Sequence, residues 1–260
     1  RQSLCAGHRI NTHQQKELLM PHAIQGIHHV TAIASDPQAN VNFYTAVLGL
    51  RLVKRTVNFD DPGTYHLYYG DTTGQPGTIM TFFPYPRAFQ GQRGTRQITA
   101  TAFAIPPESV GFWVDRLREH AVEPEAPRMR FDETVITFFD PDGMLIELIA
   151  AQGTDSGPFW QDGPVPDTHA IRGFYRVTLA MNDARPSADF LRDVLGFAPA
   201  ATAGERPRFA NGGTGPGQHI DIVELPNVKP GHVAAGSVHH VAFRVPDDAA
   251  QAAWRERIRA

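Results

Sequence analysis

Four stretches of the chain alternate between apolar and polar residues with the two-residue period of a β-strand. They are GIHHVTAI, RQITATAF, GFYRVTLA and GSVHHVAF, at residues 26–33, 96–103, 173–180 and 236–243. This alternation is typical of a strand with one face in the core. The stretches recur at intervals of 70, 77 and 64 residues when they are aligned on His29, Thr99, Arg176 and His240. The pattern therefore predicts a repeated unit that opens with a strand.

Each predicted strand is followed by the signals of an amphipathic helix. Seven residues after the alignment point stand residues that suit a helix start, namely Asp36, Pro106, Asp183 and Asp247. Fourteen residues after it stand four aromatic residues, although aromatics make up only 10% of the chain: Phe43, Trp113, Phe190 and Trp254. In units one and three a glycine that can end a helix follows Val-Leu, at Gly49 and Gly196. Each unit therefore begins with a strand and then a helix.

The rest of each unit is predicted to be strands separated by Gly- and Pro-rich turns. The expected strands cover residues 51–58, 66–69, 78–83, 134–138, 144–150, 208–210 and 218–225. The fold class is α+β, with four βαβββ modules that pair into two cup-shaped mixed sheets. We expect an N-terminal extension at 1–25, a first two-module domain at 26–150, a linker at 151–170 and a second domain at 171–260.

Both ends of the chain carry expectations of their own. The fourth unit has only its first strand and its helix, so we expect the sequence to be a C-terminally truncated form of a longer chain. Met20 is a candidate natural start, and an ordinary disordered N-terminus is the alternative. Cys5 lies in this segment and receives no catalytic role.

Composition narrows the class of protein. Apolar residues make up 42% and charged residues 20%, with a net charge of −3. This balance argues against binding to nucleic acid through bulk positive charge. No apolar run is long enough for a membrane span, so no membrane partner is expected. A single cysteine excludes an internal disulfide and favours a cytoplasmic location. Self-association to a homo-oligomer stays open.

Two of the four units carry a histidine pair at the alignment point, His28-His29 and His239-His240. Imidazoles from two strands in one cup would begin a metal site. The alternative is two unrelated histidine pairs on polar edge strands. Among the other histidines, His66 either lines the pocket or is a hydrogen-bonded strand residue. We expect His219 and His232 in surface loops.

At these residues the chain resembles the vicinal oxygen chelate superfamily, which includes glyoxalase I and extradiol dioxygenases. The segments GIHHVT, LVKRTVNFD, YHLYYGD, PGTIMTFFP and VHHVAF resemble the hydroquinone-type ring-cleaving dioxygenases. The resemblance implies that His29 and His240 bind Fe(II), with Mn(II) as an alternative metal. It gives His28, His239 and Thr31 catalytic roles around these ligands. It also implies a carboxylate ligand on the last strand of unit four. The distance from the alignment point to the last strand in units one to three places this ligand near residues 285–292, beyond residue 260.

The middle units have no such pairs. Glu147 and Asp221 fall at the last-strand position, but their units carry Thr99 and Arg176 where a ligand histidine would stand. We expect a metal-free cup there, in which Arg176 pairs with Glu147 or Asp221.

Three functions follow from these features. The leading hypothesis is a non-haem Fe(II) dioxygenase of extradiol type that opens hydroquinone- or catechol-like rings with O₂. The second is a glyoxalase-type, metal-dependent isomerase or transferase. The third is a metal-free binding protein for an aromatic ligand. A truncated dioxygenase lacking the carboxylate is expected to have little activity.

Overall fold

The strands of the structure, a computed structural model, fall largely where the alternating pattern predicts them. Residues 23–213 and 216–259 are described; Cys5, Met20 and most of the predicted extension lie outside them. In chain order the elements are β1 (Ile27–Ala34), α2 (Pro37–Asn42), β2 (Arg51–Val57), β3 (Tyr65–Gly70), β4 (Ile79–Pro84), β5 (Gln97–Ile105), α3 (Val110–Glu119), β6 (Arg128–Arg130), β7 (Glu133–Phe139), β8 (Leu145–Ala150), β9 (Phe174–Met181), α4 (Arg185–Asp189), β10 (Ala198–Ala203), β11 (Arg206–Ala210), β12 (His219–Glu224), β13 (Val238–Phe243) and α5 (Asp248–Arg259). No helix among these residues is long and apolar enough to cross a membrane.

The units pair into two mixed sheets, which confirms the predicted α+β class. Units one and four form a five-stranded sheet in the order β13-β1-β4-β3-β2. Units two and three form an eight-stranded sheet in the order β10-β11-β12-β9-β5-β8-β7-β6. Within each of the first three units the first strand lies parallel to the last, and between units the first strands pair antiparallel. We call the five-stranded sheet the first cup and the eight-stranded sheet the second cup.

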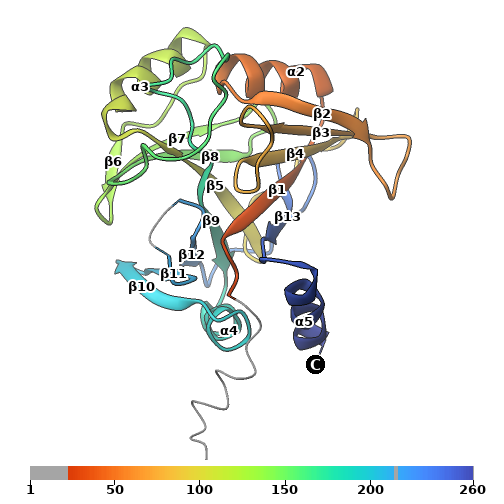
Figure 1. The fold of residues 1–260 in the computed structure, drawn as a ribbon, viewed down its shortest axis with the longest axis vertical. Coiled ribbons are helices and arrows are strands. Elements are labelled where there is room, and N and C mark those ends of the chain that lie inside the picture. Colours follow the sequence, from red (N-terminus) through yellow and green to blue (C-terminus); the bar gives the residue numbers. More distant parts are fainter. Residues whose placement is uncertain (1–22, 214–215, 260) are drawn as a thin grey trace, which may run out of the picture.

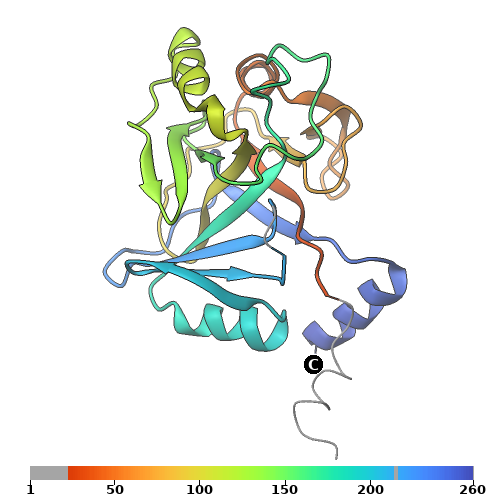
Figure 2. The same ribbon diagram turned by 60° about the vertical axis from the view of Figure 1, so that its left-hand side comes forward.

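Both cups draw strands from both halves of the chain. The predicted domain division at 150/171 follows chain order, whereas each sheet joins a unit from one side of it to a unit from the other. The connector between units one and two also lies beside the connector between units three and four, through bridges such as Gln90–Ala235 and Gln92–His232. Helices α2 and α3 lie at one end of the molecule and α4 and α5 at the other, with the strands between them (Figures 1 and 2).

The start of α2 and the ends of the helical segments in units one and three lie at the residues that the sequence marks, whereas the N-cap of α4 is Ala184 and not the predicted Asp183. Asp36 caps α2, because its carboxylate accepts hydrogen bonds from the backbone N–H groups of Gln38 and Ala39. Gly49 and Gly196 have φ angles of +67° and +77°, so each takes the left-handed conformation after its helix. A π-helical turn precedes each glycine, over Phe43–Val47 and Phe190–Val194, which the sequence pattern did not predict.

Two features of the repeat differ from the prediction. The strands β6 and β10 complete units two and three, but the sequence did not predict them. The strand β6 is only three residues long, and β10 is an exposed run of small residues, so neither shows a clear alternation of apolar and polar positions. Three residues of the aromatic column are buried, at Phe43, Trp113 and Trp254. The fourth, Phe190, is 45% exposed and borders an apolar groove beside β13. The column therefore marks the core in three units of four.

Candidate metal centre

A β-bulge lies at each histidine pair. On β1, Ile27 pairs with Phe243 and His29 with Ala242, so His28 is the extra residue. On β13, Thr31 pairs with His240 and Ala32 with Val238, so His239 is the extra residue. A bulge re-aims side chains locally and breaks strict alternation. The two strands thus carry the same irregularity at the same position of the repeat.

The bulges bring together the two histidines that the sequence nominates as ligands. The Nε2 atoms of His29 and His240 lie 3.1 Å apart. On the far side of each ring, Nδ1 lies near Nδ1 of the neighbouring histidine, at 3.0 Å for His28–His29 and 2.8 Å for His239–His240. A ring that donates from Nδ1 keeps its Nε2 lone pair free. Two such lone pairs then converge on one point between β1 and β13.

The environment keeps these imidazoles neutral. Burial lowers the pKa of His29 to about 4, and the neighbouring His240 and His28 lower it further. Burial, and then His239, lowers the pKa of His240. A metal binds the neutral form of imidazole. This donor set of two neutral imidazoles therefore fits a divalent transition metal.

A chain of hydrogen bonds leads away from the two rings. The Thr31 hydroxyl lies 3.0 Å from His240 Nε2 and 2.8 Å from the Thr81 hydroxyl. The Thr81 hydroxyl lies 3.0 Å from His66 Nε2, and the Tyr68 hydroxyl lies 2.9 Å from His66 Nδ1. His66 is thus a hydrogen-bonded strand residue on β3, as one of the two sequence hypotheses held. Burial, and then His240, lowers its pKa to about 4.

The structure places the predicted site residues as follows. His28, His29, Thr31, His239 and His240 all lie on the paired strands β1 and β13. Among the described residues no group of three His, Cys, Asp or Glu side chains is arranged to hold a metal ion. The metal-binding roles of His29 and His240 and the expected carboxylate therefore stay predictions. The sequence did not identify Tyr68. Its position two residues after His66, which places both side chains on the same face of β3, was the signal that could have found it.

The second cup holds a buried network of charges around Arg176. Its guanidinium lies 2.7 Å from Glu147 Oε2 and 3.0 Å from Asp221 Oδ2, which confirms both predicted partners. Glu133, which the sequence did not single out, lies 3.0 Å from Arg176 and also contacts Arg208. Burial alone would raise the pKa of Glu147, but Arg176 and Arg130 outweigh it and hold this pKa below its ordinary value. Glu147 is therefore ionised at neutral pH.

One histidine prediction is wrong. His219 was expected in a surface loop, but it lies on β12, is 7% exposed and packs near the ring of Tyr175. The Gly-rich segment before it suggested a loop, whereas the strand begins at His219 itself. His232 does lie in an exposed loop.

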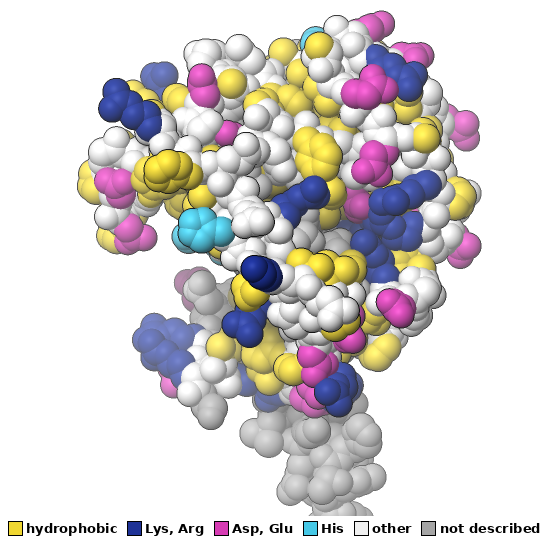
Figure 3. Space-filling model, turned by 180° about the vertical axis from the view of Figure 1, so that it is seen from behind, with side chains coloured by type: hydrophobic (Ala, Val, Ile, Leu, Met, Phe, Trp, Pro, Cys, Tyr) yellow, Lys and Arg dark blue, Asp and Glu magenta, His cyan; other side chains and the backbone are white. Residues whose placement is uncertain are grey.

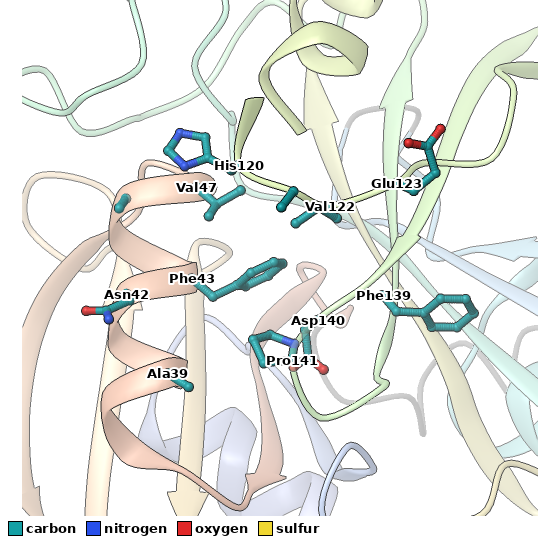
Figure 4. Close-up of a pocket in the computed structure, with 12 residues that line it drawn as sticks. Ala39, Asn42, Phe43, Val47, His120, Val122, Glu123, Phe139, Asp140 and Pro141 are labelled. Carbon is teal, nitrogen blue, oxygen red and sulfur yellow. The ribbon is translucent and has the colours of Figure 1, made fainter. Parts of the chain in front are cut away.

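A separate cavity of about 600 Å³ lies between α2 and unit two, away from the histidine pairs (Figure 4). Phe43 and Val47 line it from one side and Val122 and Phe139 from the other. The Asp140 carboxylate at its edge accepts a hydrogen bond from the Tyr44 hydroxyl at 3.0 Å, and burial raises the pKa of Asp140 to about 7. The backbone N–H of Met144 also donates to Asp140, which closes the turn before β8. These contacts hold units one and two together.

Comparison with known proteins gives a consistent set of relatives. The family model "Glyoxalase/Bleomycin resistance protein/Dioxygenase superfamily" matches residues 26–148 and 173–260. The chain is 42% identical over 233 residues to the "Putative ring-cleaving dioxygenase MhqO" of Bacillus subtilis, covering 90% of this chain and 73% of the relative. It is 35% identical over 243 residues to the "Chlorohydroquinone/hydroquinone 1,2-dioxygenase" of Sphingobium indicum, covering 91% and 75%. A crystal structure titled as a putative dioxygenase from Bacillus subtilis matches with a TM-score of 0.85 and 40% identity, covering 92% of this chain and 76% of that one.

Proposed function

We propose that this chain, which belongs to the Glyoxalase/Bleomycin resistance protein/Dioxygenase superfamily, acts as a ring-cleaving dioxygenase on hydroquinone- or catechol-like diols. Its metal would be Fe(II), with Mn(II) as the alternative, and O₂ would be the co-substrate. The observation that carries the proposal is the pair of Nε2 atoms 3.1 Å apart on two bulged strands. The named relatives support the reaction class.

The two imidazoles account for part of a metal site. His29 and His240 would hold the metal, which when bound would supply a Lewis acid and open positions for substrate and O₂. The Nδ1 contacts of His28 and His239 fix the orientation of the two rings. The remaining ligand is expected to be a carboxylate, because two neutral imidazoles leave the charge of a divalent ion uncompensated.

The hydroxyl chain suggests how this protein would handle the proton of a phenolic substrate. Thr31 lies beside the ligand His240, so its hydroxyl can accept a proton from a phenol bound next to that ring. Each hydroxyl in the path would pass on its own proton as it receives one: Thr81 gives a proton to His66 Nε2, and His66 gives one from Nδ1 to the Tyr68 hydroxyl. The partly exposed Tyr68 hydroxyl would release a proton to solvent at the end of the path. A relay of this kind contributes about 10²–10⁴-fold in enzymes that use general acid–base catalysis. Phe83, whose ring centroid is 4.4 Å from that of His66, packs against the path.

Metal binding is the first test, because it separates the metal enzymes from a metal-free binding protein. Mn(II) titration followed by electron paramagnetic resonance should show one site, and added acetate should tighten it by supplying a hard anionic ligand. The variants His29→Ala and His240→Ala should lose the site, whereas His232→Ala on an exposed loop should keep it. Absence of a histidine-dependent site would overturn the proposal.

Oxygen consumption is the second test, and it separates a dioxygenase from a glyoxalase-type enzyme. The Fe(II)-loaded chain with acetate should consume O₂ with hydroquinone, at a rate that falls in Thr81→Val and His66→Phe without a change in metal affinity. Parallel assays with catechol would set the preference between para- and ortho-diols. Conversion of a glutathione hemithioacetal without O₂ uptake would favour the isomerase instead.

A further inference from the structure

Within the part of the chain that the structure describes, the second cup contains one more buried or partly buried cation than it has carboxylates to pair with it. Four guanidinium groups meet three carboxylates in its interior: Arg130, Arg176, Arg206 and Arg208 against Glu133, Glu147 and Asp221. A buried charge without a partner is costly, so such groups are normally paired. The excess positive charge therefore calls for an anion that residues 23–213 and 216–259 do not supply.

The most weakly paired member is Arg206. Its nearest carboxylate oxygen, on Asp221, is 3.5 Å away, and Arg208 at 2.7 Å and Arg176 at 3.0 Å already engage that carboxylate. Its other contact is the neutral hydroxyl of Thr178 at 3.3 Å. The Arg206 side chain is only 21% exposed, so water screens it incompletely. Burial, and then the nearby Arg130, lowers its pKa, as expected for a cation without an adequate counter-ion.

Arg206 faces a cavity of about 270 Å³ at the mouth of the second cup. Arg93 and Arg128 line the same cavity, and Arg93 is held in place by stacking on Phe139, with its guanidinium carbon 4.7 Å from the ring centre. Glu147 is the one acidic residue among the described residues of the lining, and Arg176 and Arg130 already neutralise it at 2.7 and 2.8 Å. In the view from behind, Lys and Arg side chains gather around a hollow on the side where β6 and β10 lie (Figure 3).

We propose that this cavity is a binding site for a small organic monocarboxylate with an apolar body. Arg206 would take the carboxylate, since a guanidinium matches a carboxylate in a planar, bidentate fork. The surplus of one buried cation suits a monoanion better than a phosphate dianion. Most of the remaining lining is apolar and would contact the body of the ligand: Ala100, Leu145, Ala180, Val223, Leu225 and Val228. The site is separate from the histidine pairs and does not depend on the proposed metal chemistry.

Calorimetric titration of the chain with benzoate tests the proposal. Benzoate has one carboxylate on a compact apolar ring, and benzamide is its neutral counterpart of similar shape. Benzoate should bind at least about tenfold more tightly than benzamide, because only the former forms a charge-assisted pair. Equal affinities, or no binding of benzoate, would overturn the proposal. Tighter binding of inorganic phosphate would overturn the choice of a carboxylate.

Variants then locate the site. Arg206→Met keeps the apolar stem and should weaken benzoate binding at least about tenfold. Arg93→Met, on an exposed loop where the fold is not at risk, should weaken it by a smaller factor. Arg192→Met changes an exposed arginine paired with Asp189 and Asp193 on the far helix, and it should have no effect. A double variant of His29→Ala and His240→Ala should bind benzoate as the wild type does. If that variant loses binding, or if Arg206→Met and Arg93→Met both retain it, the ligand sits elsewhere and the proposal fails.

Discussion

The two cups share one backbone plan and differ in what their first strands carry. In each cup two first strands pair antiparallel, and each complete unit adds its last strand in parallel. The first cup carries His29 and His240 on this strand pair, half-buried and neutral. The second carries Arg176, which is fully buried and ionically paired with three carboxylates.

The difference shows what decides whether a cup of this plan can hold a metal. In the first cup the Nε2 atoms of His29 and His240 converge, and neither ring forms a salt bridge with a described residue. In the second cup Glu147 and Asp221 would be good ligands by type, but guanidinium groups already use their oxygens. The arginine that stands in the place of a ligand histidine therefore turns a candidate metal cup into a structural ion network.

The largest expected effect comes from removing the centre of that network. Arg176→Met should lower the free energy of unfolding by about 3–5 kcal/mol, because it leaves three buried carboxylates without their shared cation. Urea unfolding measures this loss. Arg192→Met, at an exposed ion pair, should change stability little. The double variant Arg176→Met with Glu147→Gln should recover part of the lost stability. If it does not, the loss in Arg176→Met is not due to the unpaired charge of Glu147.

The second effect separates the cups by metal affinity. His29→Ala or His240→Ala should weaken Mn(II) binding at least about a hundredfold, since each removes one of two converging donors and losses at supporting residues alone reach 10–100-fold. The urea midpoint should move far less than in Arg176→Met. A matched change in the second cup, His219→Ala, should leave metal affinity intact. Equal losses from both cups would contradict the assignment of the site to the first.

A third, smaller effect concerns acid sensitivity in the second cup. Burial, and then Arg208, lowers the pKa of His219 from 6.5 to about 4. The unfolded chain therefore takes up this proton first, so the stability due to neutral His219 is present above pH 6.5 and falls as the pH drops toward 4. Between pH 7.5 and 5.5 the loss is about 1 kcal/mol.

The matching experiment compares the pH dependence of unfolding in wild type and in His219→Gln. The variant should be less sensitive to acid over this range, and His232→Gln in an exposed loop should behave as the wild type. The difference between proteins is the informative quantity, because Asp140, whose pKa is raised to about 7, acts in the opposite direction. Parallel curves for wild type and His219→Gln would show that His219 does not resist protonation.

The smallest expected effect lies at the helices that flank the cups. Asp36→Ala should cost about 0.5–1 kcal/mol, because Asp36 accepts from two backbone N–H groups at the start of α2. Asp183→Ala should cost less, because Asp183 precedes the N-cap Ala184 of α4 and accepts from one backbone N–H group, that of Arg185. Thermal unfolding of the two variants measures both. A larger loss at Asp183 would contradict this ranking.

Much of the fold followed from local sequence. The period of two identified the first strand of every unit, and Asp36, Gly49 and Gly196 marked helix ends through their own backbone preferences. The strand β10 was missed because it pairs as an exposed run of small residues, whose position depends on β11 rather than on its own pattern. Phe190 broke the aromatic column for a similar reason, since its exposure depends on neighbours outside its unit.

By itself, the sequence determined the repeat, the histidine pairs and the expectation that Arg176 pairs with Glu147 or Asp221, because residue type and spacing can be read along the chain. Only the tertiary structure decided which atoms meet. The bulges that aim His29 Nε2 at His240 Nε2, the entry of Glu133 into the ion network and the burial of His219 all depend on strand register between units far apart in the chain. A register that joins residues more than two hundred positions apart is fixed by packing of the whole sheet, and no local pattern records it.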